Sequence, residues 1–600
     1  MEAKYTLTVV DVTGIQHYIF GSNRLAENVG ASQLVHQATT AWLRDALPVG
    51  RHNLQEGRNA LTIDRQRFLE EDATLDAEVV LCGGGNVLIL FRTGDLARAT
   101  ITKLSQRILC AAPGIEIAVA HQEFNWNEES IGGEKEGVHY RLYQTLNQAK
   151  QQRRPSAPLL SLGVTLECAA TGLPAVGFTE RQGQDDTPRA VSAEVLAKHD
   201  YRDAARARFE QIFGELITGY NIPPDFDDLG GSRDEMRYIA VVHADGNGMG
   251  KRFQKEIEKR SGAKKNRDCL NALRDLSIAV DQAGMQALKA TVQRMIARFD
   301  LDQSEEMRAF VKGLEDPTNN GERNLPFRPI VYGGDDVTFV CDGRIGLSLA
   351  RIYLEEWERV TQAQTKLGQA YACAGVAIVK TRYPFVRAYE LAEALCKGAK
   401  QQLRKAECGD ASALDWHFAM SGIGGTIQQI REREYHDNEG KRPLYLRPVG
   451  LRAGVLGPTW YGWDAFDRTI RSFQNNSLAR ESLGLDGGGA GASTLRQAQG
   501  SATAPLAELV EAKRRGPELF RANNNSLWRE RRNKVKQLRE VLREGANAVE
   551  RFRIAFNIPL LPELDQTKPD LQEKGWYGNH CGYFDAIEAL DFYLPLTEEG

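Results

Sequence analysis

The predicted order of strands and helices occurs twice along this chain, and this repetition constrains the fold more than any other feature. Apolar periodicity predicts a strand, two helices, two strands around a glycine-rich corner, a helix and a strand, beginning at TLTVVDV (residues 6–12). The same β–α–α–β–β–α–β order begins again at RYIAVVHADGNGMG (237–250). Such a unit, with short hairpins, predicts an antiparallel sheet with helices packed on one face, which is an α+β fold.

Local sequence favours a duplication over a chance repetition of the element order. CGGGNVLIL (82–90) aligns with YGGDDVTFV (332–340) without a gap. The tetrapeptide AKQQ occurs at both 149–152 and 399–402, near the end of the last predicted helix of each unit. We therefore interpret the first two thirds of the chain as two copies of one unit.

With 600 residues, the chain is too long for a single hydrophobic core. We predict a first unit over residues 1–182, a connecting helical segment over 183–232 and a second unit over 233–422. Long charged helical patterns then predict a helical C-terminal domain over 423–600. A glycine- and alanine-rich stretch inside it, residues 484–505, is typical of a flexible loop.

Composition excludes several classes of protein. Hydrophobic residues make up 42% and charged residues 26%, with a net charge of −4, so a strongly basic nucleic-acid binder is not indicated. No apolar run approaches the roughly 20 residues that cross a bilayer, and the N-terminus does not resemble a signal peptide, so we expect no membrane association. The nine cysteines are scattered and form no CxxC pair, which predicts a reducing cytoplasm and no zinc.

Three carboxylates of the second unit are candidate metal ligands. Asp245 ends an apolar strand, and Asp335 with Asp336 occupies the corner of the following hairpin. On adjacent strands these carboxylates would raise one another's pKa unless a cation neutralised them. Mg²⁺ or Mn²⁺ takes such oxygen ligands, and two-metal nucleotidyl transfer uses such a cluster to activate a hydroxyl and steady the leaving pyrophosphate.

Glycines around these carboxylates suit a phosphate ligand. Gly333 and Gly334 allow a tight turn and the close approach of a triphosphate. In DGNGMGK, the backbone around Gly248 and Gly250 offers N–H groups to phosphate, and Lys251 offers a point charge.

The alternative interpretation of GGDD is a polar hairpin turn, because Asp and Gly both favour turns. The duplicated corner argues against it. Gly85 and Asn86 stand in the first unit where Asp335 and Asp336 stand in the second, so the corner forms without carboxylates there. We expect one active site, in the second unit, and a non-catalytic first unit.

Five segments together resemble a known family, the large palm-domain subunit of type III CRISPR effector complexes. The resemblance implies tandem palm domains of the ferredoxin-like, polymerase and nucleotide-cyclase type, followed by a helical C-terminal domain. It covers residues 5 to 420 and is weak in the tail. The segments are DVTGIQHYIFGSNRLAENVGASQLV (11–35), GGGNVLILF (83–91), ADGNGMGK (244–251), YGGDDVTF (332–339) and AGVAIVKTRYPFVRAYELAEAL (374–395).

This resemblance implies a nucleotidyltransferase that joins ATP into cyclic oligoadenylate, an antiviral second messenger. It implies that Asp245, Asp335 and Asp336 hold the metals. It also implies that the GIQ segment, with Gly14 and Gln16, lies near a second ATP. The implied partners are guide-RNA-containing effector subunits, with target RNA as activator.

The chain departs from the family in three places. It starts directly with the first palm strand, so the DNA cleavage of relatives with an N-terminal HD domain is not expected. Asn247 stands where some relatives carry a second acidic residue, so the first metal would rely on Asp245 and the carbonyl of Gly246. No cysteine pair marks a zinc insert, and Cys168 is expected to be a small buried residue.

Several alternatives stay open at this point. GIQHYIF contacts a nucleotide or packs Tyr18 and Phe20 into the core. The basic helix RRNKVKQLRE (531–540) binds RNA or a partner, although a solvated face is the commoner meaning of such charge. His243 is catalytic or structural. The competing functions are a catalytically silent scaffold of a CRISPR ribonucleoprotein, and a cyclic dinucleotide synthase that uses another NTP, such as a diguanylate cyclase-like enzyme.

Overall fold

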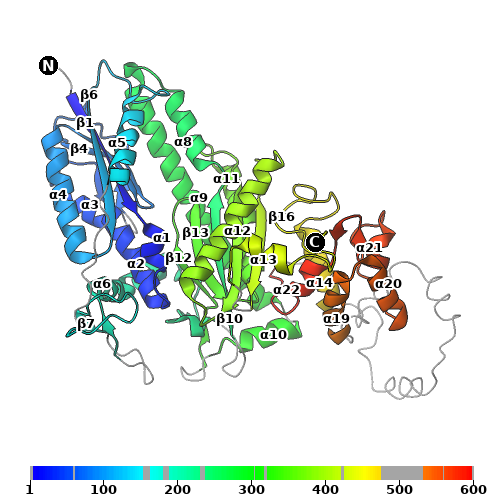
Figure 1. Cartoon of the computed structure of the whole chain (residues 1–600). Coiled ribbons are helices and arrows are strands. Elements are labelled where there is room, and N and C mark those ends of the chain that lie inside the picture. The colour runs from blue at the N-terminus through cyan, green and yellow to red at the C-terminus, as the bar shows by residue number, and fades with distance from the viewer. Residues whose placement is uncertain are drawn as a thin grey trace.

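Two sheets and a helical tail lie in a row in this computed structural model (Figure 1). The predicted glycine- and alanine-rich loop at 484–505 falls outside the residues that the structure describes. These residues are 4–57, 61–152, 163–179, 188–229, 237–302, 304–315, 321–420, 424–474, 532–558 and 560–596.

The first palm is built on a four-stranded antiparallel sheet of order β4-β5-β1-β6. Its strands are β1 (Lys4–Thr13), β4 (Ala77–Gly83), β5 (Asn86–Phe91) and β6 (Glu116–Asn125). Its helices are α1 (Ile15–Phe20), α2 (Leu25–Thr39), α3 (Ala41–Ala46), α4 (Gly94–Ala111) and α5 (Val138–Gln152). A connecting segment with α6 (Ala193–Asp200) and α7 (Arg202–Phe213) then packs against α2.

The second palm repeats this arrangement and extends it. Its six-stranded sheet has the order β12-β13-β10-β14-β15-β16, with β10 in the place of β1. The strands are β10 (Tyr238–Gly246), β12 (Phe327–Val331), β13 (Asp336–Asp342), β14 (Ala372–Lys380), β15 (Ala413–Ala419) and β16 (Val449–Gly450). The helices are α8 (Met249–Glu258), α9 (Asn266–Leu301), α10 (Glu305–Lys312), α11 (Gly346–Ala363) and α12 (Phe385–Lys405).

Strand register confirms the duplication at the level of single residues. Asp11 pairs with Asn86 across β1 and β5, as Asp245 pairs with Asp336 across β10 and β13. The helix that follows each central strand begins after a left-handed glycine, Gly14 at φ 67° and its counterpart in the second palm at φ 69°. The α+β class with tandem palms is therefore confirmed.

Helices cover both faces of each sheet, whereas the sequence analysis expected one. On β10, Ile239 and Val241 join a core shared with α2 of the first palm, while Ala240 and Val242 face α11. The strand sequence YIAVV explains this burial of both faces, because it is continuously apolar. A strand with one solvent-exposed face would alternate apolar and polar residues.

The helical tail packs on the second palm, on the side away from the first palm (Figure 1). Trp416 of β15 contacts Phe466 of the tail, with ring centroids 4.9 Å apart. Because β16 (Val449–Gly450) joins the second sheet, the sheet extends past residue 422; the four domain boundaries stay predictions. The tail helices are α13 (Ile427–Glu434), α14 (Trp463–Gln474), α19 (Arg532–Arg543), α20 (Ala546–Ala555), α21 (Pro569–Lys574) and α22 (Phe584–Ala589).

One long helix joins the two palms. α9 has 36 residues and so spans about 54 Å. Near its start, Arg267 and Arg274 bind Glu78 of β4, with nitrogen–oxygen distances of 2.6 and 2.5 Å. Its middle lies under the GGDD corner, where Asp281 Oδ1 accepts a hydrogen bond of 3.2 Å from the backbone N–H of Gly334. α9 thus sets the distance between the first sheet and this corner.

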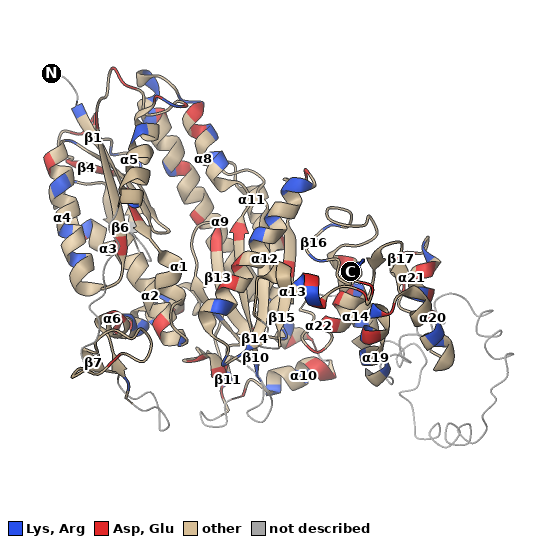
Figure 2. Ribbon diagram, viewed as in Figure 1, with Lys and Arg blue, Asp and Glu red and all other residues tan. Residues whose placement is uncertain are grey.

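Charged residues of both signs share the outer helices. Figure 2 shows Lys and Arg interspersed with Asp and Glu along helices such as α4 and α8. On the predicted basic helix, now α19, Val535 and Leu538 are buried and Lys536 forms an ion pair of 2.9 Å with Asp591. Within the described part of the chain, no helix is long and apolar enough to cross a membrane.

The buried ion pairs of Glu78 predict a large effect of its substitution. Glu78→Gln leaves Arg274 buried without its counter-charge, so we expect the free energy of unfolding in urea to fall by about 3–5 kcal/mol. Asp95→Ala is the matched control, because it removes an exposed ion pair with Arg98 and should change stability by less than about 1 kcal/mol. Equal effects of the two substitutions would contradict a structural role for Glu78.

Candidate active site

The three predicted carboxylates meet at one end of the second sheet. Asp245 lies near the end of β10, and Asp336, its register partner, begins β13. The backbone N–H of Gly246 donates a hydrogen bond of 3.1 Å to the carbonyl of Asp335. Adjacent antiparallel strands thus bring together the residues that the sequence analysis predicted.

The corner is held by backbone contacts that only glycine permits. Gly333 and Gly334 have φ values of 125° and 76°, in the left-handed region that other residues rarely adopt. Across from them, a Cβ added to Gly284 of α9 would lie 2.0 Å from the carbonyl oxygen of Gly334. The corner therefore rests directly on the helix backbone.

The carboxylates of this corner are poorly neutralised. Burial, followed by the negative charge of Asp245, raises the pKa of both Asp335 and Asp336 to about 7. The Asp336 side chain is still 45% exposed, so water softens the effect of burial there. Its Oδ1 atom is buried and has no hydrogen-bond partner among the described residues. Such an oxygen favours a cation.

His243 does not supply that cation. Its Nδ1 forms a hydrogen bond of 3.1 Å with Thr338 Oγ1 and lies 3.4 Å from Asp336 Oδ1 without a hydrogen bond to it. Burial lowers the pKa of His243 to about 4, so the ring is neutral at physiological pH. The structure favours the structural interpretation of this histidine, which also packs edge-on against Tyr389 at 5.6 Å.

Lys400 of α12 is the residue that sequence reasoning missed. Its Nζ contacts Asp245 Oδ2 and lies 2.8 Å from the carbonyl oxygen of Gly246. These two oxygens are the predicted ligands of the first metal. The signal was the repeated AKQQ, because the same lysine, Lys150, lies 2.6 Å from Asp11 in the first palm.

The first palm shows what the site becomes without its paired carboxylates. Asn86 donates a hydrogen bond of 3.1 Å to Asp11, whose charge Lys150 already balances. A Cβ added to Gly85, whose φ is 82°, would lie 2.2 Å from the end of the Ile15 side chain, so a side chain in the place of Asp335 would require Ile15 to shift. The first palm keeps the acid–lysine pair and lacks any further ligand.

The donor set of the second palm fits a divalent cation. Asp335, Asp336 and Asp245 offer hard oxygen ligands, one of them unsatisfied, together with the Gly246 carbonyl. Within the described ranges, no three His, Cys, Asp or Glu side chains are grouped closely enough to hold a metal ion. The carboxylates repel one another, and Asp245 is engaged by Lys400.

The remaining predicted residues divide between the two palms. Gly248 precedes α8, and Gly250 with Lys251 lies in its first turn. Asn247, directly after β10, donates its side-chain N–H to the Ala411 carbonyl at 3.0 Å, while its Oδ1 is buried without a hydrogen-bond partner among the described residues.

Gly14 and Gln16 open α1 of the first palm. This helix reaches the second palm through Phe20, whose ring stacks on Tyr389 at 3.8 Å. Tyr18 and Phe20 are buried, as the packing interpretation of GIQHYIF expects, while Gln16 is exposed. Contact of Gly14 or Gln16 with a nucleotide stays a prediction.

Residues 238–408, which contain this site, match the family model of Cas10/Cmr2, second palm domain. The second palm is Cas10-like. No curated protein matches the chain. Several solved structures are similar to it, all at low sequence identity.

A crystal structure of a Csm1–Csm4 cassette in complex with cA4 is 14% identical to the chain, with a TM-score of 0.41 and 79% of this chain covered. One in complex with pppApA is 13% identical, with a TM-score of 0.46 and 98% covered. The Csm1–Csm4 subcomplex of a type III-A CRISPR-Csm interference complex is 12% identical, with a TM-score of 0.45 and 98% covered. The chain spans 58%, 69% and 70% of these longer chains.

The raised pKa of Asp336 in the Cas10-like palm predicts that its charge costs stability. Because the folded-state pKa lies above the usual 3.8, the carboxylate destabilises the fold at pH 8 and stops doing so as it gains a proton below pH 7. After discounting for its exposure, we expect Asp336→Asn to raise the free energy of unfolding by about 1 kcal/mol at pH 8, without divalent cations.

Asn86→Asp is the mirror control for this measurement. It loses a hydrogen bond to Asp11 and adds repulsion, so it should lower stability at pH 8. If Asp336→Asn raised the free energy of unfolding as much at pH 5 as at pH 8, the electrostatic explanation would be contradicted.

A substitution that adds one methyl group to α9 tests the contact between this helix and the GGDD corner. We expect Gly284→Ala to destabilise the protein by about 1–3 kcal/mol and to speed hydrogen exchange at the corner, because the Gly334 backbone must move. Gly398→Ala in α12 is the control: the added methyl meets nothing within 4 Å, so helix propensity should leave stability unchanged or higher. Similar losses of stability in Gly284→Ala and Gly398→Ala would contradict the contact between α9 and the corner.

Proposed function

We propose that the second palm is a metal-dependent nucleotidyltransferase that joins ATP into cyclic oligoadenylate. The observation that carries the proposal is the convergence of Asp245, Asp335 and Asp336, with raised pKa values and an unsatisfied Asp336 oxygen, in a domain that matches the Cas10/Cmr2 second palm. An uncompensated cluster of this kind is costly to a fold, and it is typical of a site that binds a cation during its work.

In this proposal Asp245, Asp335, Asp336 and the Gly246 carbonyl hold Mg²⁺ or Mn²⁺. When bound, the two cations neutralise the carboxylates, favour the attacking 3′-hydroxylate and stabilise the pyrophosphate that leaves the α-phosphate. The chain itself supplies the binding surface. Lys400 is the nearest ammonium and is free to move to a phosphate once a cation replaces it at Asp245.

The glycine-rich segments position the nucleotides. Gly333 and Gly334 leave the corner without side chains, so a triphosphate can approach the backbone closely. Gly248 and Gly250, with Lys251, offer N–H groups and a positive charge to phosphate oxygens at the start of α8. Gly14 and Gln16 of the first palm contact a second ATP.

The proposed setting is antiviral defence in the cytoplasm. The chain acts with guide-RNA-containing subunits of a CRISPR effector complex, and target RNA activates it. Support comes from the match of residues 238–408 to the family model of Cas10/Cmr2, second palm domain.

One observation favours a second candidate, a catalytically silent scaffold. Lys400 neutralises Asp245 in the same way that Lys150 neutralises Asp11 in the non-catalytic first palm. A palm that keeps this ion pair permanently would hold a complex together without turnover.

The test is product formation from each labelled NTP with Mg²⁺ or Mn²⁺, with and without guide and target RNA, analysed by mass. We expect cyclic oligoadenylate from ATP and a loss of at least about 100-fold in Asp335→Ala/Asp336→Ala, since both metals lose ligands. Asn86→Ala, at the equivalent corner of the first palm, is the matched control and should retain activity.

The other outcomes separate the alternatives. Product from GTP alone would support a cyclic dinucleotide synthase of the diguanylate cyclase type. No product under any condition, together with no Mn²⁺ bound in equilibrium dialysis, would support the scaffold and overturn both enzyme proposals.

A further inference from the structure

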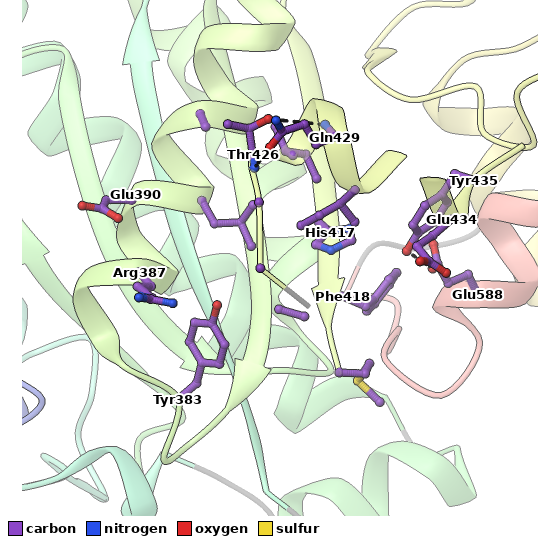
Figure 3. Close-up of a pocket in the computed structure, with 18 of the residues that line it drawn as sticks. Tyr383, Arg387, Glu390, His417, Phe418, Thr426, Gln429, Glu434, Tyr435 and Glu588 are labelled. Atoms are coloured by element: carbon purple, nitrogen blue, oxygen red, sulfur yellow. Dashed lines mark hydrogen bonds between the residues drawn. The ribbon is translucent and has the colours of Figure 1, made fainter. Parts of the chain in front are cut away.

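A cavity of about 780 Å³ lies where the second palm meets the helical tail, apart from the carboxylate corner. Helix α12, the end of β15, the start of α13 and the tail helix α22 surround it (Figure 3), and α19 lines it with Arg539 and Arg543. Asp245, Asp335, Asp336 and Lys400 do not line it. Its volume is in the range of cavities that bind small organic ligands.

His417 gives the cavity an unsatisfied polar group. This residue of β15 is only 5% exposed, and its Nδ1 is sealed from solvent without a hydrogen-bond partner in the described part of the chain. Figure 3 shows its ring between Tyr383 and Arg387 on one side and Tyr435 on the other. A ligand in the cavity can therefore reach this ring only through Nε2, the other nitrogen.

The imidazole of His417 is neutral. Burial, together with the positive charges of Arg447 and Arg431, lowers the pKa of His417 to about 3. A neutral imidazole offers one N–H donor and one nitrogen acceptor. Since Nδ1 is sealed, Nε2 can donate or accept one hydrogen bond according to the tautomer, which suits a single polar atom on the edge of a nucleobase or a hydroxyl.

The uncommitted charge near His417 is positive. Among the described residues, the Arg387 side chain has no ion-pair partner. The acidic lining residues are occupied or turned away: Glu588 is bound by Arg447 at 2.8 Å and by the Tyr435 hydroxyl at 2.6 Å, and Glu434 is bound by Arg433 at 2.9 Å. In Figure 3 the carboxylate of Glu390 points away from His417.

Aromatic rings and a helix start complete the lining. Tyr383, Phe418 and Tyr435 offer surfaces on which a planar base can stack. Helix α13 begins at the cavity, where a capping box between Thr426 and Gln429 already satisfies two backbone N–H groups. Flat rings, a neutral hydrogen-bonding ring and an unpaired guanidinium together match a nucleoside phosphate.

We propose that this cavity is a second nucleotide site, which holds the base edge on His417 and the phosphate on Arg387. Helix α12 separates it from the corner. Tyr389 and Lys400 point from one side of the helix toward the carboxylates, whereas Arg387 and Leu391 line the cavity from the other. At 100° per residue these two pairs lie on opposite faces of the helix.

The test is binding of AMP and of ATP to the full chain by isothermal titration calorimetry in EDTA, so that metal-dependent binding at the corner is absent. We expect one equivalent of AMP to bind to the unmodified chain and to Asp335→Asn/Asp336→Asn alike. Arg387→Gln and His417→Phe should each weaken binding at least about 10-fold, through the lost charge and the lost hydrogen bond. Arg404→Gln is the matched control: it makes the same substitution on the same helix outside the lining of the cavity, and it should leave affinity within about twofold.

Three outcomes would overturn the proposal: no AMP bound, binding unchanged in Arg387→Gln, or inorganic phosphate bound as tightly as AMP with no effect of His417→Phe. Arg387 is at the surface of a helix, so its variant tests the site even if His417→Phe does not fold, which thermal unfolding would show. Binding in EDTA by the corner double variant also keeps this test separate from catalysis: either proposal can fail alone.

Discussion

The buried carboxylate of Glu78 is the contact on which the arrangement of the two palms depends. It lies on the edge strand of the first sheet, and both arginines that neutralise it come from α9, nearly 200 residues later in the chain. Moving α9 away from β4 would leave the Glu78 carboxylate buried without its arginines, which is strongly destabilising. The ion pairs therefore hold α9 in one position relative to β4. The same helix then supports the GGDD corner through Asp281 and Gly284. The same helix therefore fixes both the position of one palm relative to the other and the position of the GGDD corner.

Local signals predicted the parts of the fold that are local. Strand ends and glycine-rich turns are local signals, and the repeated element order then predicted that β10 lies beside the β12–β13 hairpin, which makes Asp245 and Asp336 neighbours. The ion pair between Lys400 and Asp245 joins residues 155 positions apart, and no periodicity within either segment reveals it. The burial of both sheet faces was missed although the apolar runs of β1 and β10 carried the signal.

The two palms share one backbone arrangement but differ in the side chains at the equivalent corner, so the chain allows the two corners to be compared directly. In the first palm Lys150 balances the charge of Asp11, and Asn86 donates a hydrogen bond to Asp11, so that corner carries no uncompensated charge even though Asn86 Oδ1 has no partner among the described residues. Replacing Asn86 by its counterpart Asp336, and Gly85 by Asp335, gives a corner with more negative charge than the chain can neutralise. Stability is lowered at the one place where a cation can restore it, as is common at functional sites.

In the proposed metal site, Lys400 would make cation entry at Asp245 an exchange. Its ammonium group is a tethered positive charge, whose local concentration is fixed by α12 and does not fall on dilution. A monovalent ion would gain little by replacing one unit charge with another. A divalent ion would bring a second charge to Asp335 and Asp336, whose pKa values are raised by burial and by the charge of Asp245. In that proposal the lysine favours divalent over monovalent ions.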